Sequence, residues 1–175
     1  MTDGWPPAPI RTQRLVLRGS RAGDRDAFVE LYGSAQVGAY VGGPKAPEAL
    51  EQLPEVPGRR PGVFAVELDG AMIGTVMLER RKLGPRDRVQ VDVDLGYLFL
   101  PRAWGHGYAY EACAAALEWF AAAFPGESVV LCTQTANEAS MRLAAKLGFS
   151  EVQRFQAFGA QQWFGLVTPG CATGT

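Results

Sequence analysis

The segment best suited to chemistry is a glycine turn between an apolar run and a predicted helix. Gly105 and Gly107 stand two residues apart, shortly after the run that ends at Leu100-Pro101. Glycine has no Cβ, so a ligand can approach the backbone closely there. The first amides of a helix are unpaired donors at the positive end of its dipole. The turn is therefore suited to bind a phosphate or pyrophosphate group.

Two other interpretations of these glycines exist. A dinucleotide-binding fingerprint needs a third glycine, but Tyr110 stands at that position, and three or more predicted strands precede the turn. Alternatively, the glycines only shape a tight turn without binding anything. The second interpretation stays open on spacing alone.

The elements on both sides of the turn follow from hydrophobic periodicity. Alternation over residues 89–100 predicts a half-buried strand, with one face apolar (Val89, Val91, Val93, Leu95) and the other polar and solvated (Gln90, Asp92, Asp94). A helix is expected from about Gly107 to Pro125-Gly126, with apolar positions Cys113, Leu117, Phe120 and Phe124. A strand at Val129 to Thr133 follows. Asn137 is then expected to cap a helix that ends at Gly148.

The remaining segments complete a mixed sheet. Strands are expected at 15–17, 63–68, 72–79, 149–155 and 163–167, with a hairpin turn at Asp69-Gly70. Asp24 is expected to cap a helix that presents Phe28, Leu31 and Tyr32, and residues 33–61 leave room for at most one short helix, near 48–53. The order of elements predicts an α/β fold (mixed α+β sheet) with helices on both faces.

Length and composition limit the organisation and the partners. The 175 residues suit one domain, expected at 10–167 between a loose leader (1–9) and a polar tail (168–175). With 47% hydrophobic residues, 20% charged residues and a net charge of −1, the chain resembles an ordinary globular protein and not a nucleic-acid binder. The sequence leaves open whether it is a monomer or a homodimer.

Cysteine, histidine and hydropathy indicate the setting. Three cysteines without paired spacing argue against a disulfide framework, and no apolar run reaches the roughly 20 residues of a membrane span. We therefore expect a cytoplasmic protein without membrane contact. His106 is the only histidine, so sites that need two imidazoles are excluded and no metal is expected.

Two motifs together resemble a known family. Arg102-Ala103-Trp104-Gly105-His106-Gly107 matches the R/Q-x-x-G-x-G/A acyl-coenzyme A motif of the GNAT family of N-acetyltransferases. Three further segments resemble the branch that acetylates the N-termini of ribosomal proteins (RimJ/RimL-like): the preceding Asp94-Leu95-Gly96-Tyr97, the following Tyr108-Ala109-Tyr110-Glu111-Ala112 and the later block from Asn137 to Phe149. The likeness covers about residues 10–167 and is strongest over 92–155.

The resemblance implies a fold and a mode of donor binding. It implies a mostly antiparallel central sheet in which the strand ending at Leu100 splays from the strand at Val129, so that pantetheine pairs with main-chain groups near Phe99 and Leu100. The expected binding residues for acetyl-CoA are Phe99, Leu100, Arg102, Gly105, His106, Gly107, Tyr108, Ala109, Asn137 and Ser140. The amides of Gly105, Gly107 and Tyr108 would hold the pyrophosphate, and Asn137 would contact the pantetheine arm.

The resemblance also suggests catalytic roles. Asp94 stands where family members often place a base, although Asp92 and Asp94 also fit a solvated strand face. Many relatives carry a tyrosine as the acid where this chain has Ala144. Ser140, Tyr97 or water must then assist the departing thiolate, unless no acid is needed.

Other reactive or aromatic residues have simpler interpretations. His106 is expected to face solvent, and the tryptophans to be core or pocket wall. The basic run of Arg80, Arg81, Lys82, Arg86 and Arg88 is expected to be a solvated loop, with contact to an adenosine phosphate as the alternative. No cysteine is placed as a nucleophile.

The expected activity is transfer of an acetyl group from acetyl-CoA to a primary amine, on a small molecule or a protein N-terminus, by direct attack in a ternary complex. One alternative is a non-catalytic acyl-CoA-binding or sensing domain. Another is a partner-binding domain that has lost the cofactor, which the two glycines, Asn137 and Ser140 argue against.

Overall fold

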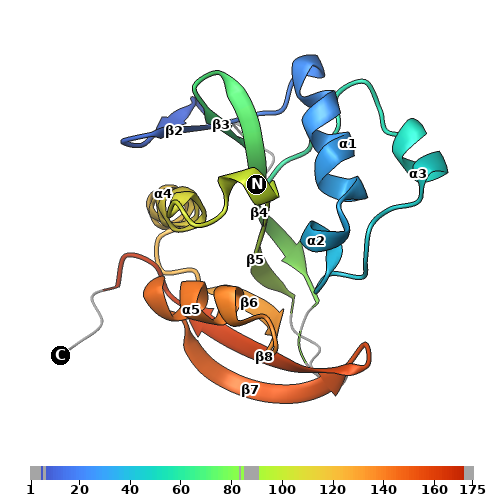
Figure 1. Ribbon diagram of the computed structural model, residues 1–175. Coiled ribbons are helices and arrows are strands. Elements are labelled where there is room, and N and C mark those ends of the chain that lie inside the picture. Colours follow the sequence, from blue (N-terminus) through green and yellow to red (C-terminus); the bar gives the residue numbers. More distant parts are fainter. Residues whose placement is uncertain (1–4, 6, 83, 85–90, 172–175) are drawn as a thin grey trace. The chain divides into compact units, whose positions relative to one another are not determined.

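The computed structural model describes residues 5, 7–82, 84 and 91–171 (Figure 1). Its strands are β1 (Ile10–Arg11), β2 (Leu15–Arg18), β3 (Val63–Leu68), β4 (Ala71–Arg81), β5 (Asp92–Phe99), β6 (Val129–Gln134), β7 (Ser150–Ala157) and β8 (Ala160–Val167). Its helices are α1 (Arg25–Gly33), α2 (Ala35–Gly38), α3 (Pro47–Glu51), α4 (Tyr108–Ala123) and α5 (Glu138–Lys146), with short 3-10 turns η1 (Ala22–Asp24) and η2 (Pro101–Ala103). The start predicted for the strand before the glycine turn, Val89-Gln90, lies outside the described residues.

The strands form one mixed sheet in the order β1-β2-β3-β4-β5-β6-β8-β7. β5 and β6 run parallel, with Val93 opposite Val129 and Asp94 opposite Val130. The pairs β1–β2, β2–β3, β3–β4, β6–β8 and β7–β8 are antiparallel. The mostly antiparallel mixed sheet predicted for this sequence is therefore confirmed. Its hairpin at Asp69-Gly70 is also confirmed, with φ of 50° and 85° at the two turn residues.

The described residues fall into two compact units: those up to Met77 with Tyr97–Ala112, and those of Leu78–Gly96 with the ones from Cys113 onward. In the first unit, the predicted apolar face of α1 is confirmed, because Phe28 and Leu31 pack with Ala65, Met72 and Leu100 in one buried cluster. The last of these residues directly precedes η2. This cluster therefore anchors the segment that leads into the glycine turn.

The second unit is organised around the strands β6, β7 and β8. β6 pairs with β8 from Val129–Val167 to Gln134–Gln162, and β7 runs along the other side of β8 (Figure 1). Val129, Val130 and Phe164 are completely buried. This packing holds β6 in place ahead of α5.

Two predictions for the N-terminal half are wrong in detail. Residues 33–61 contain two short helices, α2 and α3, where at most one was expected. The Ser34 hydroxyl accepts a hydrogen bond from the Val37 amide (3.2 Å), which stabilises α2 locally. Asp24 does stand at the start of α1, but its carboxylate accepts hydrogen bonds from Arg18 (2.8 and 2.9 Å) and the Arg21 amide instead of capping that helix.

The predicted solvated face of the strand before the turn is also wrong. Asp92 and Asp94 are only 6% and 4% exposed, and Val93 and Leu95 are buried as well. Alternation of apolar and polar residues predicts one solvent-exposed face. An interior strand that is covered on both faces, however, also buries its polar positions. A buried carboxylate requires an electrostatic partner.

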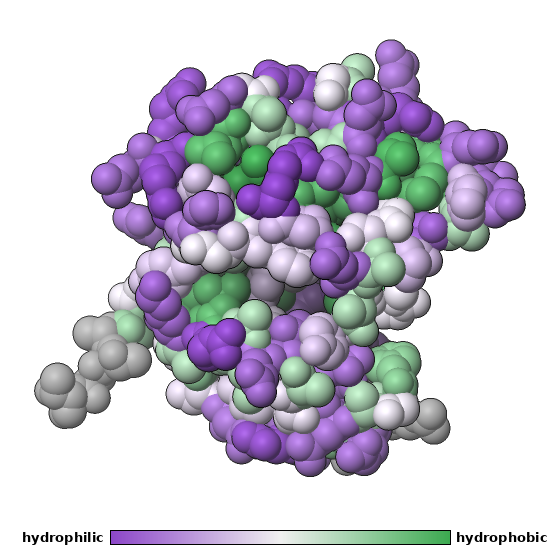
Figure 2. All heavy atoms as spheres, viewed as in Figure 1, coloured by the Kyte–Doolittle hydropathy of each residue, from purple (hydrophilic) through white to green (hydrophobic). Residues whose placement is uncertain are grey.

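Polar and charged side chains dominate the visible surface, with smaller apolar groups between them (Figure 2). Phe158, at the turn between β7 and β8, is 96% exposed and has a φ of 53°. None of the helices in the described part of the chain combines the length and apolar character that crossing a bilayer requires.

Candidate functional site

The glycine turn connects β5 to α4 through one turn of 3-10 helix. Leu100 and Trp104 are extended on either side of η2, where the Ala103 amide donates to the Leu100 carbonyl (2.8 Å). Gly105 and Gly107 then both have a φ of 79°, in the left-handed region that other residues rarely adopt. The backbone path therefore requires glycine at both positions, immediately before α4 begins.

The space beside both glycines is open. A Cβ on Gly105 would meet no atom within 4 Å, and one on Gly107 would meet only Nη2 of Arg14, at 3.5 Å. The first bond of the helix joins the Glu111 amide to the Gly107 carbonyl (3.1 Å), so the amides of residues 108–110 belong to the donor-rich start of α4. An exposed, side-chain-free backbone at a helix start fits an anionic ligand such as a pyrophosphate.

At the end of β5, the backbone groups of Leu100 and Phe99 differ in whether they are already used in the sheet. The Leu100 amide donates to the Ile73 carbonyl of β4 (2.9 Å), so it is already part of the sheet. Successive residues of a strand direct their backbone groups to opposite sides, so those of Phe99 face away from β4. The Phe99 carbonyl accepts a hydrogen bond from the Trp104 indole nitrogen (2.8 Å). Because its backbone faces away from β4, Phe99 is better placed than Leu100 to pair with a strand-like ligand, although its carbonyl already accepts the Trp104 bond.

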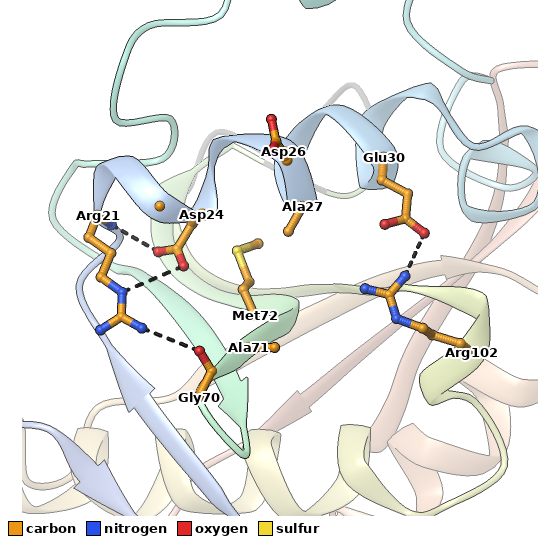
Figure 3. A pocket seen from close by; sticks show the side chains of 10 residues that line it. Arg21, Asp24, Asp26, Ala27, Glu30, Gly70, Ala71, Met72 and Arg102 are labelled. Carbon is orange, nitrogen blue, oxygen red and sulfur yellow. Dashed lines mark hydrogen bonds and ion pairs between the residues drawn. The ribbon is translucent and has the colours of Figure 1, made fainter.

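The Arg102 side chain is directed to α1. Its guanidinium forms an ion pair with Glu30 in a pocket of about 370 Å³ (Figure 3). The pocket is lined by Arg21, Gly23, Asp24, Asp26, Ala27, Glu30, Gly70, Ala71, Met72 and Arg102. Three carboxylates and two guanidiniums share this lining, so their charges largely balance. In this structure only the backbone of Arg102 takes part in the turn, because its guanidinium is paired with Glu30 of α1.

His106, Tyr108 and Ala109 complete the turn. His106 is exposed, which confirms the expectation that it faces solvent, and its ring centroid lies 5.4 Å from that of Tyr108. Tyr108 and Ala109 are half-buried in the first turn of α4. The His106 carbonyl accepts a hydrogen bond from Arg14 (2.9 Å). Arg14 therefore contacts the turn directly.

Asp94 lies on β5 and is held by an arginine of β4. Its buried carboxylate accepts a hydrogen bond from Arg81, whose side chain is half-exposed. Burial raises the pKa of Asp94 above its ordinary value, although the Arg81 guanidinium opposes this change. A carboxylate in this state can accept a proton more readily than an exposed one, which is a property of general bases.

Cys132 of β6 is the thiol that shares this electrostatic environment. Burial, with a further contribution from Asp94, raises the pKa of Cys132 to about 11. Burial also raises the pKa of Cys113. Both thiols are therefore protonated near neutral pH and poor nucleophiles.

The start of α5 has the predicted cap. The Asn137 side-chain oxygen accepts a hydrogen bond from the Ser140 amide (3.2 Å), which confirms Asn137 as the N-cap. Ser140 is 8% exposed, and Ala144 is fully buried one turn further along. Tyr97 lies half-buried on β5, three residues after Asp94.

The structure shows contacts of Arg14 and Arg81 that the sequence did not indicate. The basic run was expected to be a solvated loop; for Arg80 and Arg81 the exposure is confirmed, but the loop is wrong. Both belong to β4 and form ion pairs, Arg80 with Glu127 (2.9 Å) and Arg81 with Asp94. Arg86 and Arg88 lie outside the described residues. No pattern in the sequence indicated the Arg81–Asp94 pair, because the strand was predicted to end at Glu79, two residues before Arg81.

Among the described residues, no group of three or more histidine, cysteine, aspartate or glutamate side chains is arranged to hold a metal ion.

Comparisons with known proteins agree with this architecture. The chain is similar to an acetyltransferase (GNAT family) from Bacillus anthracis, with a TM-score of 0.75, 19% identity, and coverage of 93% of this chain and 99% of that one. It is also similar to RimL, a ribosomal L7/L12 alpha-N-protein acetyltransferase in complex with coenzyme A (TM-score 0.71, 14% identity, coverage 92% and 98%). A third similar structure is an acetyl transferase from Salmonella typhimurium that modifies the N-terminal serine of that ribosomal protein (TM-score 0.68, 13% identity, coverage 92% and 99%).

The match at the level of sequence is to a family and not to an individual protein. No curated protein matches the chain. Residues 14–150, which include the glycine turn, Asp94, Asn137 and Ser140, match the model of the acetyltransferase (GNAT) domain. The chain therefore belongs to the GNAT family of acetyl-CoA-dependent acetyltransferases.

Proposed function

We propose that this acetyltransferase moves the acetyl group to a primary amine by direct attack of the amine on the thioester, without an acyl-enzyme. The observation that carries the donor-binding part of the proposal is the open glycine turn at the start of α4, with both glycines at a φ of 79°. The high pKa that burial gives Cys132 supports the absence of a covalent intermediate, because a protonated thiol is a weak nucleophile.

On the donor side, the amides of Gly105, Gly107 and Tyr108 would hold the pyrophosphate, and the Phe99 backbone would pair with the pantetheine arm. Acetyl-CoA supplies the activated thioester. Asn137 would contact the pantetheine through its amide nitrogen, because its side-chain oxygen is bonded to the Ser140 amide. The protein's contribution on this side is binding and orientation.

On the acceptor side, Asp94 would remove a proton from the amine, directly or through water. Its burial and raised pKa support this role, and Arg81 would keep the carboxylate ionised when no amine is bound. Tyr97 or Ser140 would donate to the departing thiolate, since Ala144 provides no hydroxyl. A thiolate with a pKa near 8.5 needs little help near neutral pH.

The acceptor class is tested by a screen of thiol release. RimL and the Salmonella enzyme act on a protein N-terminus, which favours N-terminal amines as the first acceptors to try. The purified chain would be mixed with acetyl-CoA and peptide N-termini, aminoglycoside-like amines or polyamines, and free thiol would be followed. Release that depends on one amine class supports the proposal. Tight acetyl-CoA binding without release above background for every class would support the alternative of a non-catalytic sensing domain.

Replacing Ser140 with alanine is expected to lower kcat by about ten- to a hundredfold, less than the loss of a strong general acid or base. The buried hydroxyl would assist the thiolate, and the cap bond from the Ser140 amide to the Asn137 side chain is kept by the substitution. Steady-state thiol release is the measurement, with Ser34→Ala, the cap of α2, as control. Wild-type turnover in Ser140→Ala would remove Ser140 from the mechanism.

A further inference from the structure

Arg14, just ahead of β2, is bonded to both sides of the glycine turn. Its Nη1 donates to the His106 carbonyl (2.9 Å), and its Nε and Nη2 each lie 2.7 Å from Oε2 of Glu111 in the first turn of α4. The guanidinium carbon also lies 4.6 Å from the centroid of the Tyr108 ring. One side chain therefore contacts the residues before and after Gly107.

Glu111 is fixed from several directions. Its other carboxylate oxygen accepts hydrogen bonds from the Arg14 amide (2.9 Å) and the Thr12 hydroxyl (2.7 Å). Partial burial would raise the pKa of Glu111, yet the hydrogen bonds from Thr12 and Arg14 hold it below its ordinary value. Glu111 is therefore negatively charged near neutral pH.

A charged carboxylate in the first turn of α4 has two effects on an anionic ligand. It stabilises the helix start, but it repels a pyrophosphate that approaches the same amides. Arg14 neutralises this charge and also fixes the His106 carbonyl, which sets the orientation of the peptide bond into Gly107. Both actions favour anion binding at the turn.

We propose that Arg14 is a positioning residue for the acyl donor: it holds the His106–Gly107 backbone in its binding conformation and shields the pyrophosphate from Glu111. The inference rests on the proposed placement of the pyrophosphate at this turn. It concerns the affinity for pyrophosphate-containing ligands and predicts no direct effect on the amine acceptor.

The test compares two ligands by calorimetric titration, coenzyme A and acetyl-pantetheine, which lacks the pyrophosphate. Arg14→Gln should weaken coenzyme A binding by roughly ten- to a hundredfold, the range of a charge-assisted hydrogen bond. Its effect on acetyl-pantetheine should be less than about threefold. Arg154→Gln, which removes an exposed arginine paired with Glu151, is the matched control and should leave both affinities unchanged.

Glu111 provides the decisive second variant. If repulsion from this carboxylate weakens binding, the double variant Arg14→Gln/Glu111→Gln should bind coenzyme A more tightly than Arg14→Gln alone. This is expected even though both charged partners of the ion pair are then missing. If Arg14 and Glu111 only stabilised the fold, the double variant should bind coenzyme A more weakly than Arg14→Gln. If Arg14→Gln does not fold, Arg14→Lys keeps a cation that cannot span both partners, and a smaller loss confined to coenzyme A is expected.

Failure of the inference and failure of the proposed function are distinguishable. If the wild-type chain does not bind coenzyme A, the placement of the donor at the turn is wrong. If the wild type binds but Arg14→Gln loses no affinity, or loses it equally for both ligands, the role of Arg14 is overturned.

Discussion

Replacing Gly107 with valine is expected to raise the Kd for acetyl-CoA by at least about a hundredfold and to abolish thermal stabilisation by the ligand. A valine would be strained at a φ of 79°, and its side chain would fill the open space beside the turn, where a Cβ already comes within 3.5 Å of Arg14. Close approach of a pyrophosphate to the backbone would then be blocked. Calorimetric titration and thermal unfolding with and without acetyl-CoA provide the two measurements.

Gly126, in the loop between α4 and β6, is the matched control for backbone strain. Its φ is 81°, and a Cβ there would also meet open space. Gly126→Val should therefore lower the melting temperature of the free protein to a similar extent but retain acetyl-CoA affinity. An unchanged Kd in Gly107→Val would refute the placement of the donor at this turn.

Replacing Asp94 with asparagine is expected to lower kcat/KM by about a hundredfold or more. The loss relative to wild type should be largest on the acidic limb of the pH profile. A base helps most where it is ionised and the amine is still protonated. The fold-loss of kcat/KM should therefore be greatest at pH values between the pKa of Asp94 and that of the amine, and should decrease above the pKa of the amine. Acetyl-CoA affinity should stay normal, because Asp94 acts on the acceptor.

Substitutions of Arg81 and of its β4 neighbour Arg80 test whether the Arg81 cation controls the pKa of Asp94. Removing the Arg81 cation should raise the pKa of Asp94 further, because that guanidinium opposes the effect of burial. Arg81→Gln should then move the acidic limb of kcat/KM to higher pH. Arg80→Gln, which removes the exposed pair with Glu127, should leave the profile in place. Full activity of Asp94→Asn from about pH 6 to about pH 9 would exclude Asp94 as the base.

Local patterns were sufficient to predict much of the fold. The Asp69-Gly70 hairpin, the apolar face of α1 and the Asn137 cap each depend on residues a few positions apart, and all are confirmed. The glycine turn was found in the same way. Its left-handed φ values at Gly105 and Gly107 explain why the motif is visible in a single sequence.

Features that depend on distant residues could not be predicted. The burial of Asp92 and Asp94 follows from what covers both faces of β5, whereas alternation describes only one strand. The bond between Arg14 and Glu111 joins residues 97 positions apart, and although Glu111 belongs to a recognised motif, no pattern in the sequence pairs it with Arg14. Arg81 was assigned to a loop because the strand was predicted to end at Glu79, whereas β4 extends to Arg81.

The most direct test of the central claim is to follow the acetyl group itself. Acetyl-CoA labelled in the acetyl group would be mixed with the purified chain and the amine that the thiol-release screen identifies, and label would be measured on the amine and on the protein by mass spectrometry. Direct attack predicts label on the amine, at a rate equal to thiol release, and none bound to the protein. Label on a cysteine before it reaches the amine, or retention of all label in acetyl-CoA, would contradict this account.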